Sequence, residues 1–301
     1  MLARMERASE LNSLNRLFEA DDLPAGDLPA PLDNIYDGGL TIRDGSVYAN
    51  FVSSIDGIVA LDSGTAASGG IISGRNEMDR FLMGLLRAFA DAVLVGAGTV
   101  RAEGGTALWT PEYIFPAATE AFAALRQSLG RQKTPRLAIV TARGDLDPSQ
   151  RSFQVGALVL TTMAAAPRLR KALPQACEVR AVSDGDIVGV DEIFAALQAE
   201  GYRTILTEGG PHLFGRLVGH NRVDELFLTV SPKLVGDQDR SFGLIPGVDF
   251  GRTFKDAQLL SVRRSDSYLF MRYRLDRVPP SGRERLEDFP PPVAGEGRVG
   301  A

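Results

Sequence analysis

The chain has 301 residues, 44% of them hydrophobic and 24% charged, which is typical of a folded globular protein rather than a disordered one. Its formal net charge of -5 argues against a nucleic-acid-binding surface, because phosphate backbones require a dominant basic patch. One cysteine and two histidines are too few for a disulfide framework or an ordinary zinc site. No apolar run in the sequence reaches the roughly 18 residues that span a bilayer. We therefore expect a cytoplasmic protein with no metal, nucleic-acid or membrane partner.

The composition divides the chain into three parts. Residues 1–45 are predicted to be a helical extension and linker, because apolar residues recur at helical spacing from Met5 to Leu17 and three prolines follow between Asp21 and Pro31. Residues 46–277 form the predicted folded domain. Residues 278–301 are rich in proline and glycine and poor in aromatic residues, so we predict a disordered tail.

Within residues 46–277, short apolar runs alternate with segments of helical periodicity. This alternation predicts an α/β fold with a mostly parallel central sheet and helices on both faces. The last two runs are separated by the turn 265–267 and predict a C-terminal antiparallel hairpin. Strands are predicted at 47–53, 92–95, 137–141, 157–161, 178–182, 204–207, 226–230, 259–264 and 268–275, and helices at 76–90, 117–129, after Pro167 and at 191–200.

The helix predicted at 76–90 carries one apolar stripe. Phe81, Leu82, Leu85, Leu86 and Phe89 fall on that stripe, and the neighbouring charged residues, Asp79 among them, are predicted to lie off it or at the helix ends. The stripe predicts that the helix covers one face of the sheet.

A glycine motif follows the apolar run Ala92–Val95. Gly96 and Gly98 would let backbone N–H groups approach phosphate oxygens, and Thr99 adds a hydroxyl donor. A Rossmann motif would need a third glycine where Arg101 stands, so that fold is not favoured. A tight strand-to-helix turn without a ligand explains this loop alone equally well.

A second glycine motif repeats this design. The strand 204–207 is followed by Glu208, Gly209, Gly210 and Pro211, and proline favours the first position of a helix. The free N–H groups of that helix would attract a pyrophosphate. A carboxylate beside a phosphate is repelled by it, so we interpret Glu208 as facing a substrate amide or ring N–H; the alternative is a carboxylate that caps the helix.

Four motifs occur in a fixed order along the chain: Asn50–Gly57 (NFVSSIDG), Asp91–Val100 (DAVLVGAGTV), Thr207–Gly210 (TEGG), and Val223–Leu226 (VDEL) followed by Ser231–Gly236 (SPKLVG). With these motifs, the chain resembles the pyrimidine reductase family of riboflavin biosynthesis over roughly residues 47–275. The resemblance implies a dihydrofolate-reductase-like fold with an NADPH-dependent reductase domain at 46–277. It also implies reduction of the ribosyl group of 5-amino-6-(5-phosphoribosylamino)uracil, or its diamino-pyrimidinone equivalent, to ribityl.

The resemblance assigns site residues as well. Ser68, Arg87 and Glu208 would face the substrate. Together with the glycine motifs, the predicted NADPH site comprises Val52, Gly96, Gly98, Thr99, Glu103, Thr141, Gly209, Gly210, Pro211, His212, Leu213 and Phe214.

The predicted chemistry needs few protein groups, because the cofactor carries the hydride and the protein positions it. A proton must arrive with the hydride. The candidate catalytic residues are Asp56, Glu103 and Glu208, with bound water as an alternative proton source. Asp56-Gly57 is also a favoured turn pair, and Arg87 has the alternative of a solvated helix-surface cation.

The sequence departs from the family pattern at three places. Ile58 stands where the family usually has a cation, Glu103-Gly104-Gly105 replaces an Asp-Asp-Pro segment, and the zinc-deaminase motifs of the bifunctional members are absent from the sequence. Two other interpretations stay open: a dihydrofolate-type or related pteridine reductase, and a non-catalytic dinucleotide-binding protein. The family usually pairs through strands near the C-terminus, so we expect a homodimer using segments such as 226–228 and 269–271.

Overall fold

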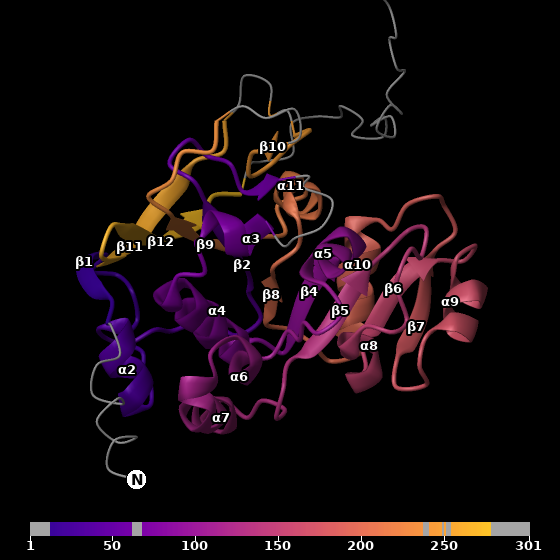
Figure 1. Cartoon of the computed structure of the whole chain (residues 1–301), viewed down its shortest axis with the longest axis horizontal. Helices are drawn as coiled ribbons and strands as arrows, with labels where there is room; N and C mark the ends of the chain where they lie inside the picture. Colours follow the sequence, from indigo (N-terminus) through magenta and orange to yellow (C-terminus); the bar gives the residue numbers. More distant parts are fainter. Residues whose placement is uncertain (1–12, 62–67, 237–240, 249, 251–253, 278–301) are drawn as a thin grey trace, which may run out of the picture.

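The computed structural model describes residues 13–61, 68–236, 241–248, 250 and 254–277 (Figure 1). Its main feature is a ten-stranded sheet with the order β1-β11-β12-β9-β2-β8-β4-β5-β6-β7. The strands are β1 (Asn15–Glu19), β2 (Val47–Ser53), β4 (Ala92–Gly96), β5 (Arg136–Val140), β6 (Leu158–Thr162), β7 (Glu178–Ser183), β8 (Ile205–Thr207), β9 (Glu225–Val230), β11 (Ala257–Ser265) and β12 (Tyr268–Leu275). A separate two-stranded sheet pairs β3 (Ala60–Leu61) with β10 (Ser241–Phe242).

The helices lie on both faces of the large sheet (Figure 1). They are α2 (Ala30–Tyr36), α3 (Ser68–Ile72), α4 (Glu77–Phe89), α5 (Ala97–Glu103), α6 (Pro111–Ile114), α7 (Thr119–Ser128), α8 (Arg151–Val155), α9 (Ala166–Ala172), α10 (Val190–Ala199) and α11 (Pro211–Gly219), with a short 3-10 helix at Pro116–Ala118. None of the helices in these described ranges has both the length and the apolar character needed to cross a membrane.

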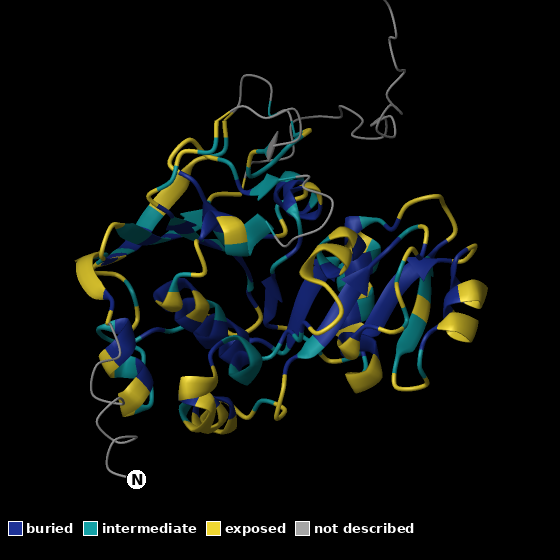
Figure 2. Cartoon of the chain, viewed as in Figure 1, coloured by how far each residue is buried: buried dark blue, intermediate teal, exposed yellow. Residues whose placement is uncertain are grey.

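The sheet has a parallel half and an antiparallel half. From β9 through β2 to β7 all neighbouring strands run parallel. β11 and β12 form an antiparallel hairpin that joins the sheet beside β9. Figure 2 shows β4, β5 and β6 buried and the outward helix surfaces exposed, as expected for parallel strands covered on both faces. The predicted α/β architecture with its C-terminal hairpin is confirmed.

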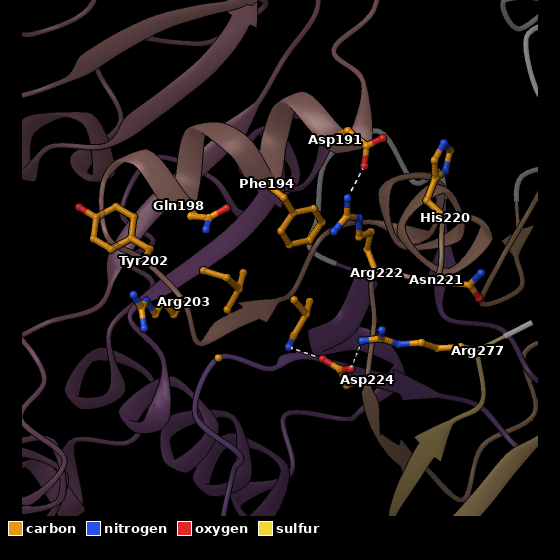
Figure 3. Close-up of a pocket in the computed structure, with 13 residues that line it drawn as sticks. Asp191, Phe194, Gln198, Tyr202, Arg203, His220, Asn221, Arg222, Asp224 and Arg277 are labelled. Carbon is orange, nitrogen blue, oxygen red and sulfur yellow. Dashed lines mark hydrogen bonds and ion pairs between the residues drawn. The ribbon is translucent and has the colours of Figure 1, made fainter.

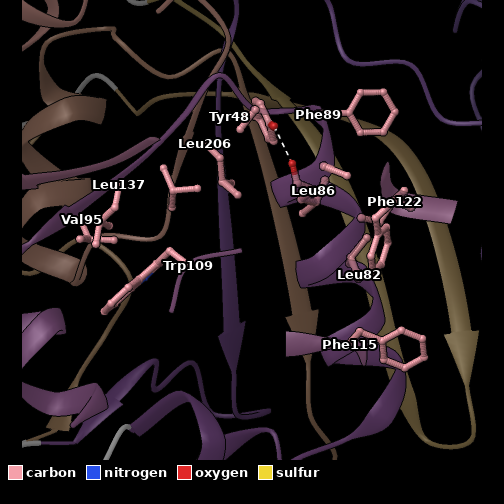
Figure 4. Close-up of a cluster of buried hydrophobic side chains, with 14 of the residues drawn as sticks. Tyr48, Leu82, Leu86, Phe89, Val95, Trp109, Phe115, Phe122, Leu137 and Leu206 are labelled. Atoms are coloured by element: carbon pink, nitrogen blue, oxygen red, sulfur yellow. Dashed lines mark hydrogen bonds between the residues drawn. The ribbon is translucent and has the colours of Figure 1, made fainter. Parts of the chain in front are cut away.

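Two apolar cores lie on opposite faces of the sheet. The larger contains the stripe of α4, with Phe81 and Leu85 fully buried and the Phe81 ring edge-to-face with Phe115 at 5.5 Å. Figure 4 shows Leu82, Leu86 and Phe122 of this core. On this face the Tyr48 hydroxyl donates to the Leu86 carbonyl at 2.8 Å. The second core lies under α10 and α11. Burial of these side chains, at about 1.5–3 kcal/mol each, is the main force holding the helices to the sheet.

The start of α4 shows how the local sequence sets the position of this helix. The Asn76 side chain accepts hydrogen bonds from the backbone N–H groups of Met78 and Asp79 at 2.9 and 3.0 Å. Such an N-cap stabilises a helix by about 1 kcal/mol. The cap places Asp79 in the first turn, where its side chain turns inward and is only 5% exposed. The prediction that Asp79 lies off the apolar stripe is therefore wrong.

The N-terminal segment differs from its prediction. Residues 15–17 belong to strand β1, which pairs with β11, so the helix predicted over Met5–Leu17 is wrong where it is described; residues 1–12 lie outside the described ranges. The unpaired edge of β11 offers backbone hydrogen bonds that outweigh the helical periodicity. Arg263 of β11 is 1% exposed, stacks on Tyr36 at 3.7 Å and pairs with Glu19 at 2.7 Å. These contacts attach the segment to the rest of the sheet. The tail predicted at 278–301 also lies outside the described residues.

Candidate active site

The short strand β8 ends between β2 and β4 at one edge of the sheet. Ala49 of β2 is in register with Thr207 of β8, and Thr207 is in register with Leu94 of β4. The residues that follow these positions therefore meet at the carboxyl edge, where ligands bind in open parallel sheets. Both glycine motifs and Glu208 lie there.

The centre of this edge holds a buried ion pair. The Arg87 guanidinium of α4 donates from Nε to Glu208 Oε1 at 2.9 Å and from Nη2 to Glu208 Oε2 at 2.7 Å. The two side chains are 6% and 8% exposed. Arg87 Nη1 also donates to the Leu108 carbonyl at 3.2 Å. Two parallel N–H···O bonds fix both groups, so Glu208 is presented as an oriented hydrogen-bond acceptor.

Arg126 of α7 makes hydrogen bonds to the backbone at the C-terminal end of α4, where Arg87 lies. Nη1 of Arg126 donates to the carbonyls of Arg87, Ala88 and Ala90 at 3.1, 3.1 and 2.8 Å. The Arg87 and Ala88 carbonyls belong to the last turn of α4, and Ala90 is its C-cap residue. The Arg87 carbonyl also accepts the Ala90 N–H at 3.3 Å. Burial lowers the pKa of Arg126 to about 10, so it stays a cation at neutral pH. Arg87 is therefore placed by a fixed helix end.

Two more carboxyl groups lie near this pair. Burial raises the pKa of Asp79 to about 6, with Glu208 adding to the rise and the hydroxyls of Thr229 and Ser73 opposing it. Burial also raises the pKa of Glu103, where the Arg87 cation lowers it and Glu208 raises it. Glu103 itself is exposed to solvent at the end of α5. With one cation among three carboxyl groups, the site favours retaining a proton.

We expect Asp79→Asn to stabilise the protein at pH 8 and not at pH 4. The raised pKa means that the folded state favours the protonated form of Asp79. The resulting contribution to the free energy of unfolding is complete below pH 4 and is lost as pH rises through about 6. Asparagine cannot ionise, so the variant should gain roughly 2–3 kcal/mol at pH 8. Denaturant unfolding at both pH values measures this difference.

The matched control is Asp147→Asn, at an exposed turn where hydrogen bonds from Ser149 lower the pKa of the carboxyl. This variant should gain nothing at pH 8, because the ionised form is the favoured one there. An equal gain for Asp79→Asn at pH 4 and pH 8 would contradict the assignment of a buried, titrating acid.

The two glycine loops lie against each other. A Cβ built on Gly210 would be 3.4 Å from Thr99 Oγ1. Gly96 has no neighbour within 4 Å of such a Cβ, and Gly98 has only the Arg101 guanidinium at 3.9 Å. Neither α5 nor α11 has a side-chain cap at its N-terminus. The protein itself leaves open space and free N–H groups beside these glycines, which suits a bound phosphate.

The other predicted cofactor residues differ in how far they are buried. Pro211, Leu213 and Phe214 are buried, with the Phe214 ring 4.6 Å from that of Phe51, while His212 is exposed. Thr141 follows β5, and its hydroxyl accepts the Gly144 N–H at 2.9 Å. Val52 is buried and lies beside α3.

Ser68 and Asp56 lie on the β2 side of this edge. The side chain of each makes hydrogen bonds to backbone groups of a neighbouring segment. The Ser68 hydroxyl donates to the Leu61 carbonyl at 2.8 Å and accepts the Leu61 N–H at 2.9 Å. Asp56 accepts the N–H groups of Val235 and Gly236, at 3.2 and 2.7 Å. Hydrogen bonds from Ser54, Gly236 and Val235 lower the pKa of Asp56 to about 2. An acid this strong is ionised at neutral pH, so its geometry fits a loop anchor rather than a proton donor.

Asn50 is a polar residue at this edge that the sequence analysis did not propose for the site. It follows Ala49, the partner of Thr207, so it lies level with Glu208 on the neighbouring strand and on the same face. Its side chain is 8% exposed, and its Oδ1 has no hydrogen-bond partner among the described residues. A buried acceptor without a donor indicates a missing water or ligand. The sequence feature that could have indicated Asn50 is its position as a polar residue inside the apolar run 47–53.

The comparisons with known proteins agree with this geometry. The chain is 28% identical over 198 residues to a 2,5-diamino-6-ribosylamino-4(3H)-pyrimidinone 5′-phosphate reductase of Archaeoglobus fulgidus, covering 64% of this chain and 83% of the relative. It is 26% identical over 204 residues to the protein of the same name from Aquifex aeolicus, covering 67% and 81%.

Among solved structures, the fold is similar to that of a pyrimidine reductase-like protein from Corynebacterium diphtheriae. The TM-score is 0.61 at 24% identity, covering 77% of this chain and 92% of that one. The family model described as the RibD C-terminal domain matches residues 46–266, a range that contains the Arg87–Glu208 pair and both glycine loops. The chain belongs to the RibD C-terminal domain family.

Proposed function

We propose that this protein is an NADPH-dependent reductase that converts the ribosyl group of a phosphorylated ribosylamino-pyrimidine to ribityl in riboflavin biosynthesis. The observation that carries the proposal is the oriented, buried Arg87–Glu208 pair between two glycine loops with open space. The names of the two curated relatives support this substrate class. The predicted cytoplasmic location fits such an enzyme.

The residues present fit a bound nicotinamide dinucleotide. Gly96, Gly98 and Thr99 on one loop, and the backbone of Gly210 on the other, would hold its phosphates through N–H groups and a hydroxyl. The Gly209 N–H is donated to the Thr207 hydroxyl at 3.3 Å, so Gly209 shapes this loop. NADPH supplies the hydride when bound. The protein contributes position and charge, which is the usual division of work in cofactor enzymes.

The polar groups of the chain have separate tasks in this proposal. Glu208, held as an acceptor by Arg87, and Asn50 beside it receive hydrogen bonds from the N–H groups of the pyrimidine. Glu103 is exposed to solvent, follows the first glycine loop on α5 and has a raised pKa, so it is the proton donor we assign. Asp56, which the sequence analysis included, is assigned to the loop anchor instead.

The test is turnover of NADPH with three compounds: the diamino-ribosylamino-pyrimidinone 5′-phosphate, 5-amino-6-(5-phosphoribosylamino)uracil and dihydrofolate. We expect NADPH oxidation with one of the first two, and a product heavier by two hydrogens in mass spectrometry. Saturable NADPH binding without turnover of either ribosylamino compound would overturn the proposed reaction and leave a dinucleotide-binding protein.

We also propose that the protein is a homodimer formed through the face of β1, β11, β12 and β9 opposite α4. One row on this face runs across four strands in direct register: Phe18, Val262, Met271 and Leu228. All four are exposed or half-buried, and Phe18 is 44% exposed. Rows of apolar side chains on an open sheet face are typical of subunit contacts.

Met271→Asp is expected to convert this dimer to a monomer, because a charge in the centre of an apolar interface is desolvated without a partner. Sedimentation velocity should show the parent protein at twice the mass of one chain and the variant at a single chain mass. Met163→Asp, at a position 56% exposed after β6, is the control and should leave the dimer intact. A parent protein that sediments as a monomer would contradict the assignment.

A further inference from the structure

A hollow of about 780 Å³ lies at the amino edge of the sheet, opposite the candidate active site (Figure 3). It is bordered by Val47 at the start of β2, Ile205 at the start of β8 and Asp224 just before β9. One face of α10 forms its wall, including Phe194. Its volume is within the range of about 300–1,000 Å³ that is usual for small-molecule sites.

The floor of the hollow is apolar and partly aromatic. Ile205 is 1% exposed, and Val47, Phe194 and Tyr202 are half-buried around it. The Arg222 guanidinium lies 5.4 Å from the centre of the Phe194 ring. An aromatic ring with a guanidinium on it is a surface on which a planar heterocycle can stack.

The rim carries more positive than negative charge, although the whole chain is acidic. Arg203, Arg222 and Arg277 line the hollow, against the carboxylates Asp191 and Asp224. Arg222 pairs with Asp191 at 2.5 Å, and Arg277 with Asp224 at 3.3 Å.

Asp224 also makes contacts with groups other than Arg277. It accepts the Val47 N–H at 2.9 Å, and Arg43 from outside the hollow pairs with it at 3.2 Å. Within the described ranges, the Arg203 guanidinium makes no hydrogen bond or ion pair, and Figure 3 shows it at the end of the hollow away from Arg277. The rim therefore retains guanidinium donors for an anion.

We propose that this hollow binds a phosphorylated aromatic heterocycle, with the ring on Phe194 and Tyr202 and the phosphate on the Arg203 guanidinium. A guanidinium matches a phosphate by paired N–H···O bonds, and the aromatic floor favours a planar ring over a sugar or an inorganic ion. The site lies at the opposite end of the strands from the glycine loops, so it is separate from the proposed dinucleotide site. The inference does not depend on the proposed reaction.

Flavin mononucleotide is a suitable probe because it combines a fused planar ring system with one phosphate. In calorimetric titrations of the full chain with saturating NADP⁺ present, we expect saturable binding of flavin mononucleotide. Riboflavin, the same ring without the phosphate, should bind at least about 10-fold more weakly, as expected for the loss of charge-assisted hydrogen bonds.

Arg203→Ala, at an exposed rim position, should weaken flavin mononucleotide binding by about 5–10-fold, the effect of removing one charged donor. Arg277→Ala, at the other end of the hollow, should change the affinity by less than about 2-fold. Arg168→Ala, which removes an arginine 63% exposed and outside the hollow, should leave the affinity unchanged. Turnover of the ribosylamino compounds by the same variants reports separately on the proposed function.

Three results would overturn the proposal: no saturable binding of flavin mononucleotide, equal affinity for riboflavin, or an Arg203→Ala variant that binds like the Arg168→Ala control. Binding that disappears when NADP⁺ is added would also overturn it, because it would assign the probe to the glycine loops. If NADP⁺ itself does not bind, the rim variants still test the hollow in titrations without it.

Discussion

Arg87→Met and Glu208→Leu are each expected to destabilise the protein by about 3–5 kcal/mol, whereas the double variant should recover most of that loss. Each single change leaves the other charge at 6–8% exposure without its partner. An unpaired buried charge is costly, but two apolar side chains of similar size are not. All three variants should lose reductase turnover, because the oriented acceptor is absent in each.

Urea unfolding of the four proteins gives the coupling energy, and turnover of the same four samples separates folding from function. The control cycle is Arg180→Met with Glu200→Leu, a pair at 2.6 Å whose side chains are 52% and 25% exposed. We expect a coupling below about 1 kcal/mol there, since solvent screens surface pairs. A double variant at Arg87 and Glu208 that is stable and active would show that the pair only supports the fold.

The parallel half of the fold was predictable because its central strands are buried on both faces. A run such as Ala92–Val95 is apolar at every position, so it predicts a central parallel strand without knowledge of its neighbours. Strand β1 was not predictable in this way. Its side chains are largely exposed, and it is a strand because the edge of β11 lies beside it. Local periodicity carries no information about such a partner.

In the candidate site, too, some positions follow from the local sequence and others depend on tertiary packing. The glycines and Glu208 follow apolar runs, and the carboxyl edge of a parallel sheet is where ligands bind, so their position could be predicted. That Arg87 pairs with Glu208, 121 residues away, depends on how α4 packs on the sheet. The burial of Asp79 could have been predicted from the sequence. Asp79 precedes Leu82 and Leu86 by three and seven residues, which places it on the buried stripe.

Gly98→Ala is expected to weaken NADPH binding by at least about 10-fold while leaving the fold as stable or more stable, by roughly 0.5–1 kcal/mol. Gly98 lies inside α5, where alanine is the better helix former. The added Cβ would meet only the end of the Arg101 side chain, 3.9 Å away. The folded protein therefore gives no reason for glycine here, and the remaining reason is the close approach of a ligand to the backbone.

Gly219→Ala is the matched control, because Gly219 ends α11 and also has no neighbour within 4 Å of a built Cβ. It should match Gly98→Ala in stability and the parent in NADPH affinity, measured by thermal unfolding and fluorescence titration. Gly209→Ala cannot serve, because its Cβ would lie 2.8 Å from Leu213 Cδ2 and a lost affinity would have a structural cause. Equal NADPH affinity of Gly98→Ala and the parent would remove the first glycine loop from the cofactor site, because a methyl group in the path of a phosphate must displace it.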